Sequence, residues 1–491
     1  MPIIRDRFNY LFKSTKGLIL VAIAMIALET ALFGMLSGPM AEFGVRDVVV
    51  RLFGMKLVEA EREGRIIILY HSIDMAIVAI ETYMVTSLLK MKEFYRTAVR
   101  VLITVGYLFA MIFGMGFAYW GHNWVLHGLY ITGLSLIFFA GVLLVIALWP
   151  WDRIYSQNDP AYSRTKGGLD MERVAFFATA LTMVLSALFG AIPGSYFGNG
   201  FEPFLAENLI RLPEKTTMQF SIIGHLHIML ALIAVMLTLI VGRWMDFKGL
   251  LQKIAMPLLI LGTIVLNLGV WGVVTPLEPV AHMIIYVGAT PAMLGALMLV
   301  IFAWDKLIRE GTAGIPKPSG WQKFKALLRD PLHFGPFWQM VFMNFTVSGI
   351  GIFYAVRLDE IFRLWPAREE RIELTGHWHV LSAIIATIIL LYYGDMIGLK
   401  GRIRRLYGWG IIVLSDLAFA SVTLFETKRL FVSEATQQPL VNTLMVLMDF
   451  GLGMLLVILA MVMIWRLSDL FKKKGRWAEE ANHELAQEVG P

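Results

Sequence analysis

Long apolar segments separated by short polar loops recur along the whole chain of 491 residues. A helix of about 20 apolar residues crosses a hydrocarbon core of about 30 Å. In lipid every backbone amide needs an internal partner, so these segments are expected to be helical. The pattern therefore predicts an all-α integral membrane protein with twelve transmembrane helices, at residues 17–38, 65–89, 97–119, 124–148, 172–194, 218–241, 254–273, 279–304, 335–356, 374–397, 406–424 and 440–466.

Composition and charge agree with this class and predict an orientation. Hydrophobic residues make up 57% of the chain and charged residues 16%, against roughly a quarter charged in soluble domains. With both termini on one side, 30 of the 43 Lys and Arg residues fall on that side and 13 on the other. The positive-inside rule then places both termini in the cytoplasm, with 467–491 as a polar tail, in the cytoplasmic (inner) membrane. The positive charge is thus an insertion signal and gives no reason to expect a nucleic-acid partner.

The start of the chain does not resemble a cleaved signal peptide, because no small-residue cleavage site follows the first apolar segment. The chain also repeats internally. Ala-Leu-Phe-Gly occurs twice, each time 37 residues before a histidine, and a second histidine follows after 56 or 55 residues. The matched positions are Gly34, His71 and His127 in the first copy, Gly190, His227 and His282 in the second, and Gly349 and His379 in a looser third. This spacing predicts one membrane domain built of three pseudo-repeats of four helices, at about 17–148, 172–304 and 335–466.

Seven of the ten histidines fall near the starts of even-numbered spans, which all begin on the predicted outer side. They are His71, His127, His225, His227, His282, His377 and His379. An imidazole in hydrocarbon is costly unless it is bonded to something. Each could bond a neighbouring helix, but a layer of histidines on repeat-related helices favours a metal or haem. Because the chain has no cysteine, covalently attached c-type haem and iron–sulfur clusters are excluded within it.

Two of the predicted helices carry His-x-His, as Gly-His225-Leu-His227 and Gly-His377-Trp-His379. Residues i and i+2 of an α-helix lie about 200° apart. Two such imidazoles cannot readily serve one small ion, but they can face two clefts on opposite sides of the helix. The spacing therefore favours two haems over a single metal.

His377-Trp-His379-Val-Leu-Ser resembles the tenth-helix motif of the haem-copper oxidase superfamily, which includes nitric oxide reductases, and His71 matches that family's second-helix ligand. Twelve spans with threefold pseudosymmetry are also similar to its catalytic subunit. The resemblance implies that His71 and His379 are the axial pair of a first haem b and that His377 is a ligand of a second. Iron with two imidazole ligands is saturated, so the first haem would only carry electrons.

The likeness does not extend to the family's copper site. The sixth predicted span has no tyrosine four residues after His225 or His227, and the seventh span, 254–273, contains no histidine. Copper requires several imidazoles. We expect His225 or His227 to complete a second bis-histidine haem opposite His377. The open alternative is that they hold non-haem iron or copper with His282 or a carboxylate.

The other histidines and the acids in the predicted spans allow several interpretations. His122, His127 and His282 could contact haem propionates or a quinone, or pack as interfacial side chains beside tryptophans. Few acids fall inside spans, and such residues are candidate functional groups. Asp74 and Glu81 share roughly one helical face with His71, and with Glu29 they could relay protons or form single hydrogen bonds to neighbouring helices.

The sequence thus predicts a membrane-integral protein with two haem b groups that carries electrons in a respiratory chain. Its expected partners are membrane lipids, quinone or quinol or an outer-side electron carrier, and other subunits of a redox complex. A gas-reducing enzyme similar to nitric oxide reductases, with a non-haem metal beside the second haem, is the alternative. Twelve spans with repeats also describe secondary transporters, but transporter sites usually lie at the midplane, whereas these histidines gather near one face.

Overall fold

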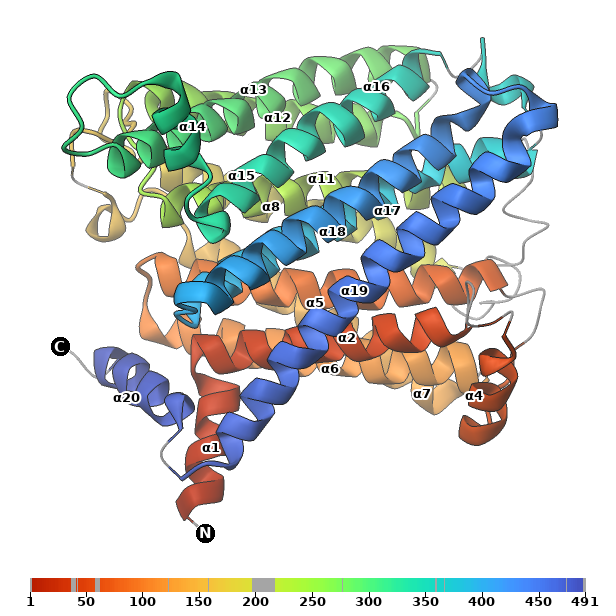
Figure 1. Cartoon of the computed structure of the whole chain (residues 1–491), viewed down its shortest axis with the longest axis horizontal. Coiled ribbons are helices and arrows are strands. Elements are labelled where there is room, and N and C mark those ends of the chain that lie inside the picture. The colour runs from red at the N-terminus through yellow and green to blue at the C-terminus, as the bar shows by residue number, and fades with distance from the viewer. Residues whose placement is uncertain are drawn as a thin grey trace.

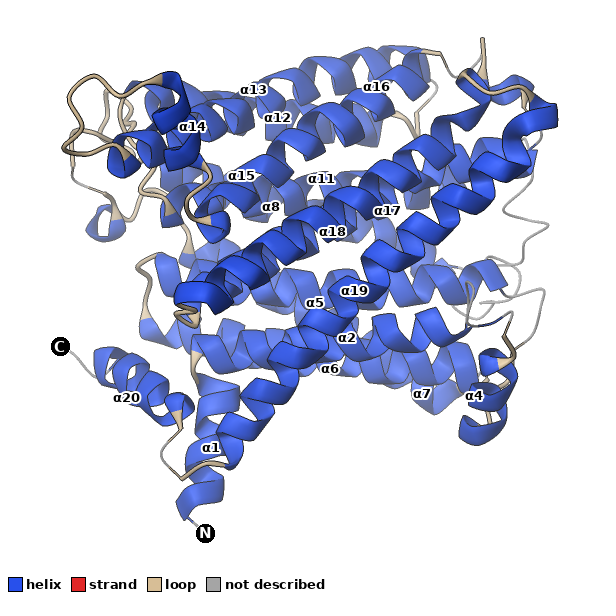
Figure 2. Cartoon of the chain, viewed as in Figure 1, coloured by secondary structure: helices blue, strands red, loops and turns tan. Residues whose placement is uncertain are grey.

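The computed structural model describes residues 2–36, 41, 43–57, 62–121, 123–157, 159–196, 217–275, 277–357, 360–365, 367–473 and 475–488. Within this part nearly all residues are helical and no β-strand is present (Figure 2). The longer helices are α1 (Pro2–Lys13), α2 (Thr15–Leu36), α4 (Val45–Phe53), α5 (Arg62–Leu88), α6 (Glu93–Trp120), α7 (Trp124–Ala147), α8 (Met171–Tyr196), α11 (Thr217–Trp244), α12 (Leu250–Gly272), α13 (Glu278–Gly311), α14 (Gly320–Leu327), α15 (Pro331–Phe342), α16 (Gly349–Val356), α17 (Ala367–Met396), α18 (Gly401–Thr427), α19 (Gln437–Phe471) and α20 (Arg476–Glu488).

Eleven helices in the described part are long and apolar enough to cross a membrane. They coincide with eleven of the twelve predicted spans, which confirms an all-α, multi-pass membrane protein. The predicted ninth span, 335–356, falls on α15, the π-helical segment η3 (Met343–Ser348) and α16, which follow one another without a break. A π-helical insertion changes the hydrogen-bond register of a helix and is frequent at functional sites. The count of twelve spans remains a prediction.

The helices lie side by side, and the same pairings recur along the chain (Figure 1). Helix α6 packs on α7, α12 on α13 and α18 on α19. Contacts of α7 with α8, of α13 with α15 and of α19 with α2 join successive groups of helices, so the last group returns to the first. Helices α5, α11 and α17 each pack on the first helix of their own group, and α11 also contacts both α5 and α17.

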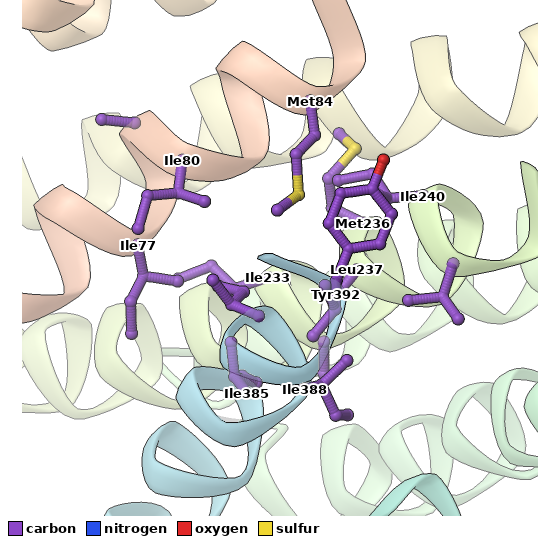
Figure 3. Close-up of a cluster of buried hydrophobic side chains, with 14 of the residues drawn as sticks. Ile77, Ile80, Met84, Ile233, Met236, Leu237, Ile240, Ile385, Ile388 and Tyr392 are labelled. Carbon is purple, nitrogen blue, oxygen red and sulfur yellow. The ribbon is translucent and has the colours of Figure 1, made fainter. Parts of the chain in front are cut away.

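The side chains where α5, α11 and α17 meet form a buried apolar core (Figure 3). They stand at matched positions, six, nine and thirteen residues after His71, His227 and His379. The nine residues are Ile77, Ile80 and Met84 on α5, Ile233, Met236 and Ile240 on α11, and Ile385, Ile388 and Tyr392 on α17. Offsets of six, nine and thirteen lie near one stripe of an α-helix. Each helix therefore turns the same face to the centre.

Polar contacts gather at the end of the bundle that carries α1, α14 and α20 (Figure 1). Arg404 donates to Asp330 at 2.7 Å and to Asp395 at 2.6 Å, which ties the start of α18 to the ends of α15 and α17. Helix α1 packs on α20, where the Tyr10 hydroxyl donates to Glu480 at 2.6 Å. The two terminal helices therefore lie on the same side of the bundle.

Candidate functional site

The predicted ligand histidines lie on the three central helices, in the half nearer their N-terminal ends. His71 is on α5, His225 and His227 are on α11, and His377 and His379 are on α17. All three helices start from the end of the bundle opposite α14, so the histidines share roughly one level. The apolar core of Figure 3 begins six residues further along each helix. That core fixes the rotation of each helix and hence the direction in which each imidazole points.

Helices α5 and α17 face each other through His379. The ring of Tyr70 stacks on the His379 imidazole, with centroids 4.3 Å apart and 13° between the planes. One turn deeper, the Ser382 hydroxyl donates to the Asp74 carboxylate at 2.8 Å. His71, beside Tyr70, lies on the same stretch of α5. The two residues predicted as the first axial pair are thus on helices that are joined at their level.

Helices α11 and α17 face each other through His227 and His377. Their ring centroids are 6.5 Å apart, with 44° between the planes. The indole of Trp378 stands edge-on to His227, with centroids 3.9 Å apart and 84° between the planes. Of the two candidates on α11, His227 is therefore the one that the structure brings toward His377.

The other histidine of α11 points toward α8. The His225 Nδ1 atom lies 2.9 Å from the backbone carbonyl oxygen of Ser186, an acceptor to which it can donate. Its ring lies against Gly190, where an added Cβ would stand 2.7 Å from three ring atoms. His225 and His227 thus face different neighbours, as the two-residue spacing predicts.

His71 is oriented by a side chain from α7. Its Nδ1 atom lies 2.8 Å from the hydroxyl of Tyr130. An imidazole that binds a metal through one nitrogen usually bonds a protein group through the other, which fixes the ring. His71 and His225 both have Nδ1 within hydrogen-bond distance of a protein oxygen, and the Nε2 atom of His225 lies against Gly190.

The segment after the π-helical insertion lies beside His377. An added Cβ at Gly351 would stand 3.3 Å from the His377 ring, and the ring of Tyr354 lies 5.7 Å from it at 74°. A larger residue at Gly351 would press on this imidazole. Glycines on α8 and α16 therefore make room for the histidines of α11 and α17.

The three histidines predicted to be peripheral differ in their surroundings. His127 on α7 stacks between Phe117 and Trp124, with ring centroids 5.0 and 6.1 Å away. The choice between a propionate or quinone contact and an interfacial side chain stays a prediction. His282 lies partly buried near the start of α13, and His122 falls outside the described residues.

Of the predicted acids, Glu29 on α2 and Glu81 on α5 are buried, and Asp74 on α5 is partly buried. Glu81 is 2% exposed, and among the described residues neither of its carboxyl oxygens has a hydrogen-bond partner. Glu29 is 6% exposed, and its Oε2 atom likewise has no partner in the described part. Asp74 is bonded to Ser382, so it joins two central helices.

The predicted ligands on α5, α11 and α17 are all histidines. Imidazole is a ligand that haem iron uses in proteins, and the porphyrin supplies the other donors. Within the described residues no three or more His, Cys, Asp or Glu side chains cluster in the way that holds a metal ion.

Comparison of the chain with models of known protein families and with curated proteins finds no match.

Several residues of this layer were not found by sequence reasoning. Tyr70, Tyr130 and Ser382 orient or bond predicted residues, but they look like ordinary residues of apolar helices. Tyr70 stands next to His71, and Ser382 ends the six-residue segment that begins at His377. Only adjacency could have drawn attention to either. Gly190 was identified through the internal repeat, which relates it to His227, but the imidazole that lies against it is that of His225.

Proposed function

We propose that this protein is a membrane-integral cytochrome with two haem b groups that carries electrons within a respiratory complex. The observation that carries the proposal is the pairing of His227 with His377 across α11 and α17, at 6.5 Å between ring centroids. Neutral imidazoles so placed inside a membrane bundle are the donor set that b-type haem uses. Bound haem would supply one-electron transfer.

Each proposed ligand has a defined place in the chain. His71 and His379 are proposed to hold the first haem, because α5 and α17 are joined at their level by the Tyr70–His379 stack and one turn deeper by the Asp74–Ser382 hydrogen bond. His227 and His377 are proposed to hold the second. His225 is proposed to line the site from the side of α8, held by Ser186.

Residues around the proposed ligands would exclude water, orient an imidazole and carry protons. The buried apolar side chains below the histidine layer exclude water, which keeps the site at low dielectric and tunes a redox potential. Tyr130 fixes the ring of His71 through a hydrogen bond at 2.8 Å. Glu81 and Glu29 are proposed to take up or pass protons, because a buried carboxyl without a partner can change its charge as neighbouring charge changes.

The orientation of the site follows from the charge distribution. The histidines lie away from the end of the bundle rich in Lys and Arg, so the proposed haems lie toward the outer face. Electrons would then come from quinol in the membrane or from a carrier on the outer side. Other subunits of a redox complex are the expected recipients.

A spectrum tests the proposal directly. Purified protein should show b-type bands in the reduced-minus-oxidised difference, and their absence would overturn the haem assignment. His227→Ala and His377→Ala should each remove the same low-spin signal. His333→Gln, at the opposite end of the bundle, is the control and should leave both signals intact.

Binding of carbon monoxide to the reduced protein distinguishes the proposed electron carrier from a gas-reducing enzyme with an open coordination position on a haem. If both haems have two histidine ligands, the reduced protein should not bind carbon monoxide. Binding to the unaltered protein would favour the alternative similar to nitric oxide reductases. Metal analysis would then show whether non-haem iron or copper accompanies the haem.

A further inference from the structure

A groove on the surface of α18 combines two exposed cations with apolar side chains. Arg402 and Arg405 stand one turn apart at the start of the helix, and Leu406, Trp409 and Gly410 continue the groove along the axis. Leu406 is 62% exposed, so its side chain is presented outward. This arrangement places charge at one end of the groove and an apolar surface below it.

The two arginines differ from their neighbour Arg404. Arg404 turns inward and bonds both Asp330 and Asp395. Arg402 and Arg405 are exposed and form no ion pair with any residue that the structure describes. Arg402 also stands in the first turn of α18, where the helix dipole already favours an anion. The groove therefore carries an uncompensated positive charge.

The apolar part of the groove lies along the lipid-facing side of α18. Ile403 is 67% exposed, Leu406 62% and Val413 58%, and they follow one face of the helix. Trp409 packs toward Phe334 with ring centroids 5.9 Å apart. Tryptophan is typical of the membrane–water boundary. At Gly410 an added Cβ would stand 2.8 Å from Ile458 of α19, so the two helices approach closely beside the groove.

We propose that this groove binds one anionic phospholipid, with its phosphate between Arg402 and Arg405 and an acyl chain along Leu406 and Trp409. Guanidinium groups bind phosphate through paired hydrogen bonds. The groove belongs to the end of the bundle that is rich in Lys and Arg, where anionic lipids attract basic residues. The exposed apolar side chains beneath the cations favour a lipid over a free anion.

Native mass spectrometry of the detergent-purified protein tests the site. The probes are phosphatidylglycerol and phosphatidylcholine with identical acyl chains. The unaltered protein should retain phosphatidylglycerol in preference. The double variant Arg402→Gln with Arg405→Gln should bind its tightest phosphatidylglycerol roughly 30-fold more weakly, because each cation near a membrane surface contributes about a fivefold factor.

Two further variants test whether a loss of phosphatidylglycerol binding is specific to the groove. Lys323→Gln with Lys325→Gln removes the same charge from exposed positions of α14 and should bind phosphatidylglycerol as the unaltered protein does. Leu406→Glu leaves both arginines in place but puts a carboxylate in the groove, so it should also weaken binding. An equal loss in the α14 variant would show that only net charge matters and would overturn the proposal.

Inorganic phosphate distinguishes a lipid site from a free-anion site. A large excess of phosphate should leave phosphatidylglycerol bound, because the acyl contacts have no counterpart in the ion. Displacement by phosphate, or unchanged lipid binding in both the arginine and the Leu406→Glu variants, would overturn the lipid assignment.

Discussion

The ring of Tyr70 on α5 stacks on the imidazole of His379 on α17, with 4.3 Å between centroids. The next residue, His71, turns toward α7 and meets the hydroxyl of Tyr130. Successive residues of a helix point about 100° apart. Tyr70 and His71 therefore contact two different helices, α17 and α7. The stack gives α5 and α17 a fixed relation at the level where the proposed first haem would bind.

Removing the Tyr70 ring should remove its stacking on His379 and lower the unfolding temperature. Tyr70→Leu and Tyr70→Phe both lose the hydroxyl, but only the phenylalanine keeps the stack. Aromatic pairs contribute about 0.5–1.5 kcal/mol beyond their buried area, so the leucine variant should unfold at a lower temperature than the phenylalanine variant. Thermal unfolding in detergent measures the difference. Equal midpoints for the two variants would show that the stack contributes nothing.

A methyl group at Gly190 should disturb His225. The added Cβ would stand 2.7 Å from the imidazole, which is too close for a real contact, and overpacking typically costs about 1–3 kcal/mol. Gly34→Ala is the matched control, because it lies at the repeat-related position on α2 and has nothing within 4 Å. Thermal unfolding should show a loss for Gly190→Ala and none for Gly34→Ala. Similar losses in both would contradict the packing found at Gly190.

The bond between Ser382 and Asp74 should stabilise the contact of α5 with α17. Ser382→Ala would leave a partly buried carboxyl oxygen without its donor, which costs about 1 kcal/mol, the lower end of the range for a buried group. Ser135→Ala on the exposed face of α7 removes a hydroxyl bonded only within its own helix, and surface changes of this kind stay within about 0.5 kcal/mol. Denaturant or thermal unfolding compares the two. A Ser382→Ala protein as stable as the Ser135→Ala protein would argue against this link.

The terminal helices should separate when Tyr10 loses its hydroxyl. That group donates to Glu480 at 2.6 Å and accepts from Arg466, and burial raises the pKa of Tyr10, so it stays protonated as a donor. Tyr10→Phe should lower stability by about 1–3 kcal/mol. It should also speed proteolysis within α20. Tyr95→Phe on α6 is the control and should cleave at the unaltered rate.

The turn between α11 and α12 should respond to acid. Asp246 accepts hydrogen bonds from Tyr162 and from Lys248, the latter at 2.5 Å. Partial burial raises the pKa of Asp246, but these bonds outweigh it and leave that pKa below the usual 3.8. A depressed carboxyl pKa stabilises the fold above its unfolded value and loses that stabilisation as the pH falls through the folded value.

Asp246→Asn keeps the left-handed backbone at this position, where φ is 55°, and removes only the charge. Because the side chain is half exposed, the expected loss near neutral pH is about 1 kcal/mol or less. The difference in unfolding temperature between the unaltered protein and the variant should be fully present near neutral pH and should shrink as the pH falls through the folded pKa of Asp246. A difference that persists at the lowest pH would exclude the carboxylate as its source.

The helices themselves were predictable because a membrane span needs only length and apolar composition. Eleven predicted spans lie on long apolar helices of the structure. The ninth predicted span falls on α15, η3 and α16 and stays a prediction, and the π-helical segment Met343–Ser348 within it was not predicted. A π-helical insertion changes which carbonyl each amide meets, and hydropathy carries no information on that register.

The sequence by itself determined that histidines recur in the N-terminal halves of three apolar helices, because histidine positions and the bounds of apolar segments are both local. It also contained the offsets of six, nine and thirteen residues that turn three helices the same way. Only the tertiary structure decided that His227 rather than His225 meets His377, that Tyr70 covers His379, and that Gly190 and Gly351 make room for imidazoles. The physical reason is that a helix fixes the angle between its own side chains, whereas the partner that each side chain meets depends on how neighbouring helices pack against it.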